Sequence, residues 1–453
     1  MNFPSVAEKW DNKALFRLLW PLVVEQILAL AMGAIDTIMV SSVGEHAVSG
    51  VNIIDNINNL LIIAFTALCT GGAVVTSQYI GRRDSANASL ASRQLYYVVT
   101  LVALVIMSVA VVLRVSIIRL LYGNIADDVM EAANIYFLIT ALSYPMLAIY
   151  NACAALFRAV GNSKVPMRIA LLVNAMNIGG NAFFIYGLKI GVTGAALSTL
   201  LSRIAAAAIL TGLLVTNRRG PITLSGILKV RFVRSTIHNI LNVGIPSGLE
   251  SSMFMVGRLL TQRIFTVFGT AAMAANAIAS VVNSFSFMPG QAFGMALLTI
   301  VGQCVGAGDY DGAKRYTAKI MKYVYLGIFA ISLGIFILRE PLVNLFDLSG
   351  EAHELAVYFL RFHCIFMSIG WGASFALPNA LRAAGDARFV MFTAIISMWT
   401  VRVSFAYFLT FVLGLGPVGV WIAMGADFIV RGSSYTIRWI RGRWQGKRVI
   451  TDP

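Results

Sequence analysis

The chain has 453 residues, of which 58% are hydrophobic and 12% charged, and its formal net charge is +15. Such a composition lies far outside the range of soluble globular proteins and indicates an integral membrane protein. The basic excess would also suit a nucleic-acid-binding protein, but the positions of the cations argue against that class.

Apolar stretches long enough to cross a ~30 Å hydrocarbon core as helices recur along the whole chain. The polar opening MNFPSVAEKWDNK precedes a first apolar stretch of full spanning length, so no cleavable signal peptide is expected. We predict an all-α integral membrane protein with twelve transmembrane helices. They cover about residues 14–41, 47–77, 94–113, 133–157, 165–187, 192–216, 240–268, 272–300, 318–338, 354–378, 389–412 and 417–437.

The cations gather at one end of successive spans, as in Lys13, Arg82, Arg158 and the tail RWIRGRWQGKR. The connections at the opposite ends collect acids such as Glu45 and Glu351. By the positive-inside rule both termini are predicted to be cytoplasmic, with the chain in the cell (plasma) membrane. The basic excess therefore sets the topology, and no nucleic-acid partner is expected.

The sequence repeats itself at a shift of 225 positions. The matches at this shift include Pro21 with Pro246, Glu25 with Glu250, Gly44 with Gly269, Asn58 with Asn283, Gln78 with Gln303 and Asp84 with Asp309. At a shift of 224, LFRAVGNSK (156–164) matches ALRAAGDAR (380–388). We predict an N-terminal six-helix lobe over residues 1–215, a basic cytoplasmic linker over 216–238 and a C-terminal six-helix lobe over 239–453. Because each half has an even number of spans, the two lobes are parallel repeats, an arrangement used by transporters that work by alternating access.

Several segments resemble the multidrug and toxic compound extrusion (MATE) family of cation-coupled antiporters. They are PLVVEQILALAMGAIDTIMVSSVGEHAVSGVN, GGAVVTSQYIGRRD, ALFRAVGNSKVP, GIPSGLESSMFMVGRLL and GQCVGAGDYDGAKR, and the similarity runs from about Leu18 to Arg438. The resemblance implies two six-helix bundles in a V that expel organic, often cationic, compounds in exchange for inward protons or sodium ions.

Asp36 is the most telling intramembrane charge. A carboxylate at the centre of a spanning helix costs about 2.5–3.5 kcal/mol on insertion scales, so it normally faces the bundle interior or a water-filled cavity. Glu25 precedes it by 11 residues, which places both acids on one helix face about 16 Å apart, with Met32 between them. The resemblance implies that Asp36 binds the coupling cation with Asn177 and Thr199. Many members of one family branch carry an aspartate where this chain has Asn181.

The second half carries a different set of charges. Glu250 lies at the position equivalent to Glu25, and Thr261 lies at that of Asp36. Some family members pair the glutamate with an acid near the position of Trp371. Since that acid is missing here, we expect Arg402 or Arg258 to neutralise Glu250. These three residues, with Glu25, Met32 and Met253, form a predicted substrate-cavity or second charge site.

The remaining charges inside the spans are Asp55, Arg203, Arg263, Arg361 and Asp427. The simplest interpretation is mutual neutralisation, for instance of Asp427 by Arg431 at i,i+4, and snorkelling of the arginines toward the interface.

Alternatives to an antiporter remain open. A flippase of the same superfamily that moves an anionic lipid-linked substrate would also suit buried arginines. An enzyme is not expected, because HExxH and GxSxG are absent and the four histidines are scattered. The lone cysteines predict neither disulfides nor a metal site. We expect a monomer that binds small-molecule substrates in the lipid bilayer, with H⁺ or Na⁺ as coupling ion and no other cofactor.

Overall fold

The computed structural model describes residues 10–123, 125–217, 220–346, 348 and 350–450. Within these residues the regular secondary structure is helical, turns and short connections join the helices, and no strand is present. Two compact units are formed, which we call the N-terminal lobe (Asn12–Gly244) and the C-terminal lobe (from Ile245 onward, with Trp10 and Asp11). The predicted all-α architecture with two lobes is confirmed.

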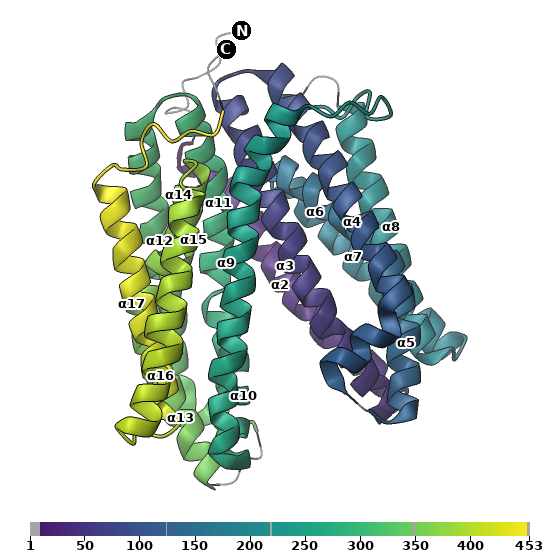
Figure 1. Cartoon of the computed structure of the whole chain (residues 1–453), viewed down its shortest axis with the longest axis vertical. Helices are drawn as coiled ribbons and strands as arrows, with labels where there is room; N and C mark the ends of the chain where they lie inside the picture. The colour runs from purple at the N-terminus through teal and green to yellow at the C-terminus, as the bar shows by residue number, and fades with distance from the viewer. Residues whose placement is uncertain (1–9, 124, 218–219, 347, 349, 451–453) are drawn as a thin grey trace. The chain divides into compact units, whose positions relative to one another are not determined.

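The N-terminal lobe is a bundle of long helices that pack along one another (Figure 1). Its helices are α2 (Asn12–Ser41), α3 (Glu45–Gly81), α4 (Ser85–Tyr122), α5 (Asp127–Leu142), α6 (Tyr144–Ala159), α7 (Lys164–Asn181) with the π-helical turn η1 (Ala182–Gly187), and α8 (Gly191–Thr216). Helices α5 and α6 meet at a bend of 48°. Pro145 follows this bend, and because proline lacks a backbone N–H it is favoured in the first turn of a new helix.

The C-terminal lobe begins within α9 (Arg234–Val267) and continues with α10 (Gly269–Ser286), α11 (Met288–Gly306) and α12 (Tyr310–Asn344). Then follow α13 (Gly350–Phe366), η2 (Met367–Ala376), α14 (Leu377–Ala383), α15 (Ala387–Ser397), η3 (Met398–Ser404), α16 (Phe405–Tyr407), η4 (Phe408–Val412) and α17 (Val418–Ile440). The η segments are π-helical and continue the neighbouring α-helices, a local widening that is frequent at functional sites.

Each of the twelve predicted spans falls on one of these helices or on consecutive ones, and the predicted span 272–300 is divided between α10 and α11. Among the described residues, nine helical segments are apolar and long enough to cross a membrane, or ten if the bent pair α5 and α6 is one span. The other two are α9 and α17. Their mean hydropathy is lowered by charged side chains, which include Glu250 and Arg258 in α9 and Asp427 and Arg431 in α17.

The outward faces of the helices are apolar, as expected where lipid replaces water. On α4, the exposed side chains of Leu101, Val105, Val109 and Val112 follow one another at intervals of three or four residues. Such a stripe would be a core-facing stripe in a soluble protein. Here it marks the surface that the hydrocarbon covers.

The repeat is visible in how helices begin. Asp84 caps α4 by accepting a hydrogen bond from the backbone N–H of Asn87 at 3.0 Å. Asp309, its match in the second half, caps α12 by accepting from Gly312 N–H at 2.7 Å. A carboxylate at this position satisfies a backbone donor that the helix leaves free.

The described part of the segment between α8 and α9 is held against α4. The Gln94 side chain donates to the carbonyl of Arg231 at 2.7 Å and accepts from Val233 N–H at 3.0 Å. Tyr97 donates to the Ile227 carbonyl at 2.8 Å, and Arg93 donates to the Ser225 carbonyl at 3.2 Å. The segment is thus a docked part of the N-terminal lobe, which extends into the first residues of α9.

Candidate functional site

A chain of polar side chains joins α2, α7 and α8 inside the N-terminal lobe. Asn181 donates to Asp36 Oδ1 at 2.7 Å and to Asn177 Oδ1 at 3.2 Å. Asn177 in turn donates to Thr199 Oγ1 at 3.3 Å. The structure therefore brings together the four residues predicted to form a cation site, and their role stays a prediction.

The helical spacing of the asparagines explains this arrangement. Asn174, Asn177 and Asn181 are three and four residues apart, so their amides share one face of α7. Asn174 donates to the carbonyl of Leu28 on α2 at 3.0 Å, while the two amides of the polar chain are fully buried. Asp36 is only partly buried. The carboxylate thus lies at the accessible end of a buried row of amides.

One oxygen of this chain is left without a partner. Asn181 Oδ1 is buried and accepts no hydrogen bond within the described residues, because the amide nitrogen makes both contacts described above. A buried carbonyl oxygen with no donor carries a desolvation cost unless a ligand satisfies it. Asp36 and the Asn181 oxygen together offer hard oxygen ligands to a small cation.

A second carboxylate in this lobe is satisfied by neutral donors. Asp55 Oδ1 accepts from Asn58 at 3.2 Å and from the Tyr136 hydroxyl at 3.4 Å. Arg203 donates to Ser143 Oγ at 2.6 Å. The sequence predicts that these charges neutralise one another. The direct contacts of Asp55 and Arg203 described above are to hydroxyl and amide groups, while Arg203 also acts electrostatically on Asp55 and Asp36.

Glu25 forms an ion pair with the end of α6. Its Oε1 lies 2.8 Å from Nη1 of Arg158, and both side chains are less than one-fifth exposed. Arg158 was counted among the topology-setting cations. Its contact with Glu25 shows that it also ties α2 to α6.

Glu250 is neutralised by Arg382, and the expectation that Arg402 or Arg258 would do so is wrong. The Nη2 atom of Arg382 lies 2.8 Å and 2.6 Å from the two carboxylate oxygens of Glu250. Asn379 Oδ1 accepts from Nη1 of the same guanidinium at 2.9 Å. The partner thus lies on α14, and the two candidate arginines are left for other contacts.

Arg402 instead belongs to a fully buried cluster around Asp427. The Asp427 Oδ2 atom lies 3.4 Å from Arg431 Nη2 and 3.6 Å from Arg402 Nη1. Ser397 donates to the other carboxylate oxygen at 2.6 Å. The predicted pairing of Asp427 with Arg431 on the same helix is confirmed, and Arg402 is an additional partner.

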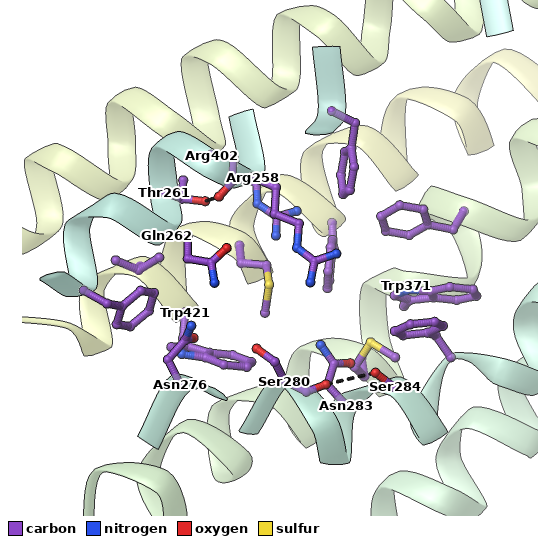
Figure 2. A pocket seen from close by; sticks show the side chains of 18 of the residues that line it. Arg258, Thr261, Gln262, Asn276, Ser280, Asn283, Ser284, Trp371, Arg402 and Trp421 are labelled. Carbon is purple, nitrogen blue, oxygen red and sulfur yellow. Dashed lines mark hydrogen bonds between the residues drawn. The ribbon is translucent and has the colours of Figure 1, made fainter. Parts of the chain in front are cut away.

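A cavity of about 290 Å³ lies inside the C-terminal lobe. Arg258 and Arg402 line it, on one side in the view of Figure 2, and Ser280, Asn283 and Ser284 appear on the other. Its walls also contain aromatic rings, among them Phe254, Trp371, Phe375, Trp421 and Phe428. Sequence reasoning found the two arginines and Trp371 but gave no reason to place them around one cavity.

The two predicted cavity methionines lie on α2 and α9. Met32 and Met253 are partly buried, and Met253 is not among the residues that line the cavity. A contact of either side chain with substrate stays a prediction.

Both halves of the chain match the model of the MatE family, over residues 21–183 and 246–408. The second match begins 225 residues after the first, which is the shift of the internal repeat. The repeat that was predicted from matched single residues is therefore confirmed.

Similar proteins cover almost the whole chain. "Uncharacterized transporter YisQ" of Bacillus subtilis (strain 168) is 28% identical over 437 residues, which are 95% of this chain and 94% of the relative. "Probable multidrug resistance protein NorM" of Thermotoga maritima is 27% identical over 453 residues, with 97% and 94% covered. A MOP superfamily transporter of solved structure from Pyrococcus furiosus, for which reverse polarity of the binding pocket suggested a different function, superposes with a TM-score of 0.88 at 19% identity over 100% of both chains.

Proposed function

Because the chain belongs to the MatE family of membrane transporters, we propose that it is a secondary antiporter that exports organic small molecules in exchange for protons or sodium ions. The named relatives that support this proposal include a multidrug resistance protein and a transporter. A flippase of lipid-linked substrates was the alternative, and nothing in the names of these relatives favours it.

The observation that carries the coupling role is the contact between Asp36 and Asn181. A partly exposed carboxylate is held at 2.7 Å by a buried amide whose oxygen has no hydrogen-bond partner within the described residues. A sodium ion at this place would receive oxygen ligands from both groups. A proton could bind to Asp36 itself, because burial disfavours the charged form of a carboxyl group. A bound sodium ion would instead stabilise the charged form.

The exchange would follow from a change in this environment during transport. The coupling ion must bind to Asp36 from the outside and leave it on the inside. The surroundings of Asp36 must therefore differ between the outward-open and inward-open states. Asn177 and Thr199 hold Asn181 in place through the buried hydrogen-bond chain. Their role would be to position the amide that contacts Asp36.

For the arrangement in the membrane we propose that both termini are cytoplasmic. The support is the concentration of lysine and arginine in the connections at one end of the spans. We further propose that the monomer is the transporting unit, because each chain contains both members of the repeat that alternating access needs.

Replacement of Asp36 by asparagine tests the coupling role. Asp36→Asn keeps the shape of the side chain but cannot exchange a proton and weakens cation binding. We expect a normally folded variant that loses uptake into proteoliposomes driven by pH or sodium gradients, which are varied independently. Ethidium and dansylglycine serve as cationic and anionic test substrates, so that the charge of the substrate is not assumed.

Glu131→Gln is the control, since it removes an exposed carboxylate of the same lobe that lies on α5. We expect it to retain gradient-driven transport. Full coupling in Asp36→Asn would contradict the proposal and assign the coupling to Glu25, Glu250 or Asp427.

A further inference from the structure

At two pairs of equivalent positions, the N-terminal lobe carries one negative charge and the C-terminal lobe one positive charge. At the 225-residue shift, Asp36 corresponds to Thr261 and Asn177 corresponds to Arg402. In the N-terminal lobe these positions hold a carboxylate and a buried amide. In the C-terminal lobe they hold a hydroxyl and a guanidinium, and both line the 290 Å³ cavity.

The cluster behind the cavity has an excess of positive charge. Asp427 is the carboxylate between Arg402 and Arg431, which lie 3.6 Å and 3.4 Å from the same oxygen. Arg258 adds a third guanidinium at the cavity wall, and the described lining residues include no carboxylate. In the buried cluster one carboxylate thus faces two guanidinium groups, and an uncompensated charge is costly in a region of low dielectric constant. Arg258, which is exposed, adds a further positive charge.

Arg402 has a donor that the protein leaves unused. The residue is 8% exposed, and its Nη1 forms no hydrogen bond with any described residue, although Asp427 lies within ion-pair distance. Its guanidinium carbon lies 5.1 Å from the centre of the Phe254 ring, which favours the cation without satisfying its N–H groups. An acceptor in the cavity would supply the missing partner.

We propose that this cavity is the binding site for the anionic group of an aromatic organic acid, such as a carboxylate or sulfonate, which the transporter carries as substrate. The proposal rests on the antiporter function and names a substrate class for it. Arg402 and Arg258 hold the anionic group, and the rings of Trp371 and Phe375 contact the aromatic part. A guanidinium suits this role because its N–H groups match two carboxylate oxygens.

The size and the remaining lining of the cavity agree with such a ligand. Sites for small molecules are mostly apolar and aromatic, with few polar groups, and begin at about 300 Å³. A cavity of about 290 Å³ therefore suits one small ring system with its charged substituent. An organic cation in the same place would face two guanidinium groups with no carboxylate among the described lining residues.

Equilibrium binding to the full-length chain in lipid nanodiscs tests the proposal without any ion gradient. The probes are dansylglycine, dansylamide and dansylcadaverine, which share one fluorophore and differ in charge as anion, neutral compound and cation. Empty nanodiscs provide the partition background, and the concentration of other anions is kept low and equal in all titrations. We expect saturable binding of dansylglycine, about tenfold or more tighter than that of dansylcadaverine.

Arg402→Gln should weaken dansylglycine binding about tenfold, because it removes a charged donor. This variant should fold, since Asp427 keeps Arg431 as a one-to-one partner at 3.4 Å. Arg402→Lys should recover part of the affinity, and Arg258→Gln should also weaken binding. Arg263→Gln is the matched control for Arg258→Gln. Arg263 is an exposed arginine that also lies on α9, but it does not line the cavity.

Equal affinity for the three dyes would overturn the proposal, and so would the absence of saturable dansylglycine binding to the wild type. Unchanged dansylglycine affinity in both Arg402→Gln and Arg258→Gln would have the same consequence. Asp36→Asn should bind dansylglycine like the wild type. Binding of dansylglycine by the wild type without any gradient-driven transport would refute the proposed antiport while leaving the anion site intact.

Discussion

Asp427 is fully buried and accepts contacts from three residues of the C-terminal lobe. Ser397 donates to one oxygen, and the guanidinium groups of Arg431 and Arg402 lie near the other. Taking one partner out of such a cluster is more damaging than removing a whole pair, because the remaining charge stays buried without compensation.

Asp427→Asn should therefore be among the most destabilising single substitutions in this lobe. Two guanidinium groups would then face each other without a carboxylate, at a cost of about 3–5 kcal/mol. Thermal unfolding of the detergent-solubilised protein should show a clear loss of stability, and added Arg402→Gln should restore part of it. Glu340→Gln, at a carboxylate with a half-exposed side chain, is the control and should leave stability nearly unchanged. Similar stability of the two single variants would contradict the assigned role of Asp427.

The pairing of Asp427 with Arg431 was predictable from the sequence because both residues lie on one helix. A separation of four residues fixes their distance, whatever the rest of the fold does. The contribution of Arg402 was not predictable in the same way. It comes from another helix segment, and its reach depends on how η3 and α17 pack.

Between helices, the most regular feature is a pair of equivalent ion pairs. Glu25 with Arg158 ties α2 to α6, and Glu250 with Arg382 ties α9 to α14. The glutamates match at a shift of 225 and the arginines at a shift of 224. Both halves of the chain thus fasten their first helix in the same way.

A double-mutant cycle tests whether each pair acts as a unit. Glu250→Gln alone should strand the guanidinium of Arg382 and lower thermal stability, whereas Glu250→Gln with Arg382→Gln should be less damaging than the two single losses added together. The same cycle at Glu25 and Arg158 should give a coupling of the same sign. Strict additivity in both lobes would contradict the pairings. A double variant of Glu250 and Arg402 should be additive, since these residues do not form a pair.

The sequence already contained the signal for the correct partner of Glu250. The match between LFRAVGNSK and ALRAAGDAR placed Arg382 opposite Arg158, and Glu250 stood opposite Glu25. Both arginines lie near the basic end of a span, where the charge distribution alone gives them a topology-setting role. Because the repeat matches the two glutamates and also the two arginines, pairing the acid with the base in each half predicts both ion pairs.

For the whole molecule, hydropathy and the repeat were enough to predict the architecture. Apolar stretches predicted twelve spans, and the family match repeats at the shift that Pro21 with Pro246 and Glu25 with Glu250 had indicated. The cavity of the C-terminal lobe could not be derived in this way. Its residues come from several helices, and spacing along the chain does not say which faces enclose an empty space.

The orientation of the whole chain can be tested by labelling. Single cysteines at Glu45 or Gly350 should react with a membrane-impermeant maleimide added to intact cells, and cysteines at Asn87 or Ser225 should react only after permeabilisation. The four native cysteines are buried, so they should give little background. The reverse pattern would refute the cytoplasmic placement of the termini.

The docking of the segment before α9 onto α4 affects how the protein can be divided. No loop separates the two lobes, since the boundary between Gly244 and Ile245 falls inside α9. A chain cut between Gly220 and Pro221 would leave the C-terminal fragment with a segment that belongs to the N-terminal lobe. The hydrogen bonds from Arg93, Gln94 and Tyr97 would then help two separately expressed fragments to associate. The segment that joins the duplicated halves would thereby also provide the contact by which the two fragments recognise each other.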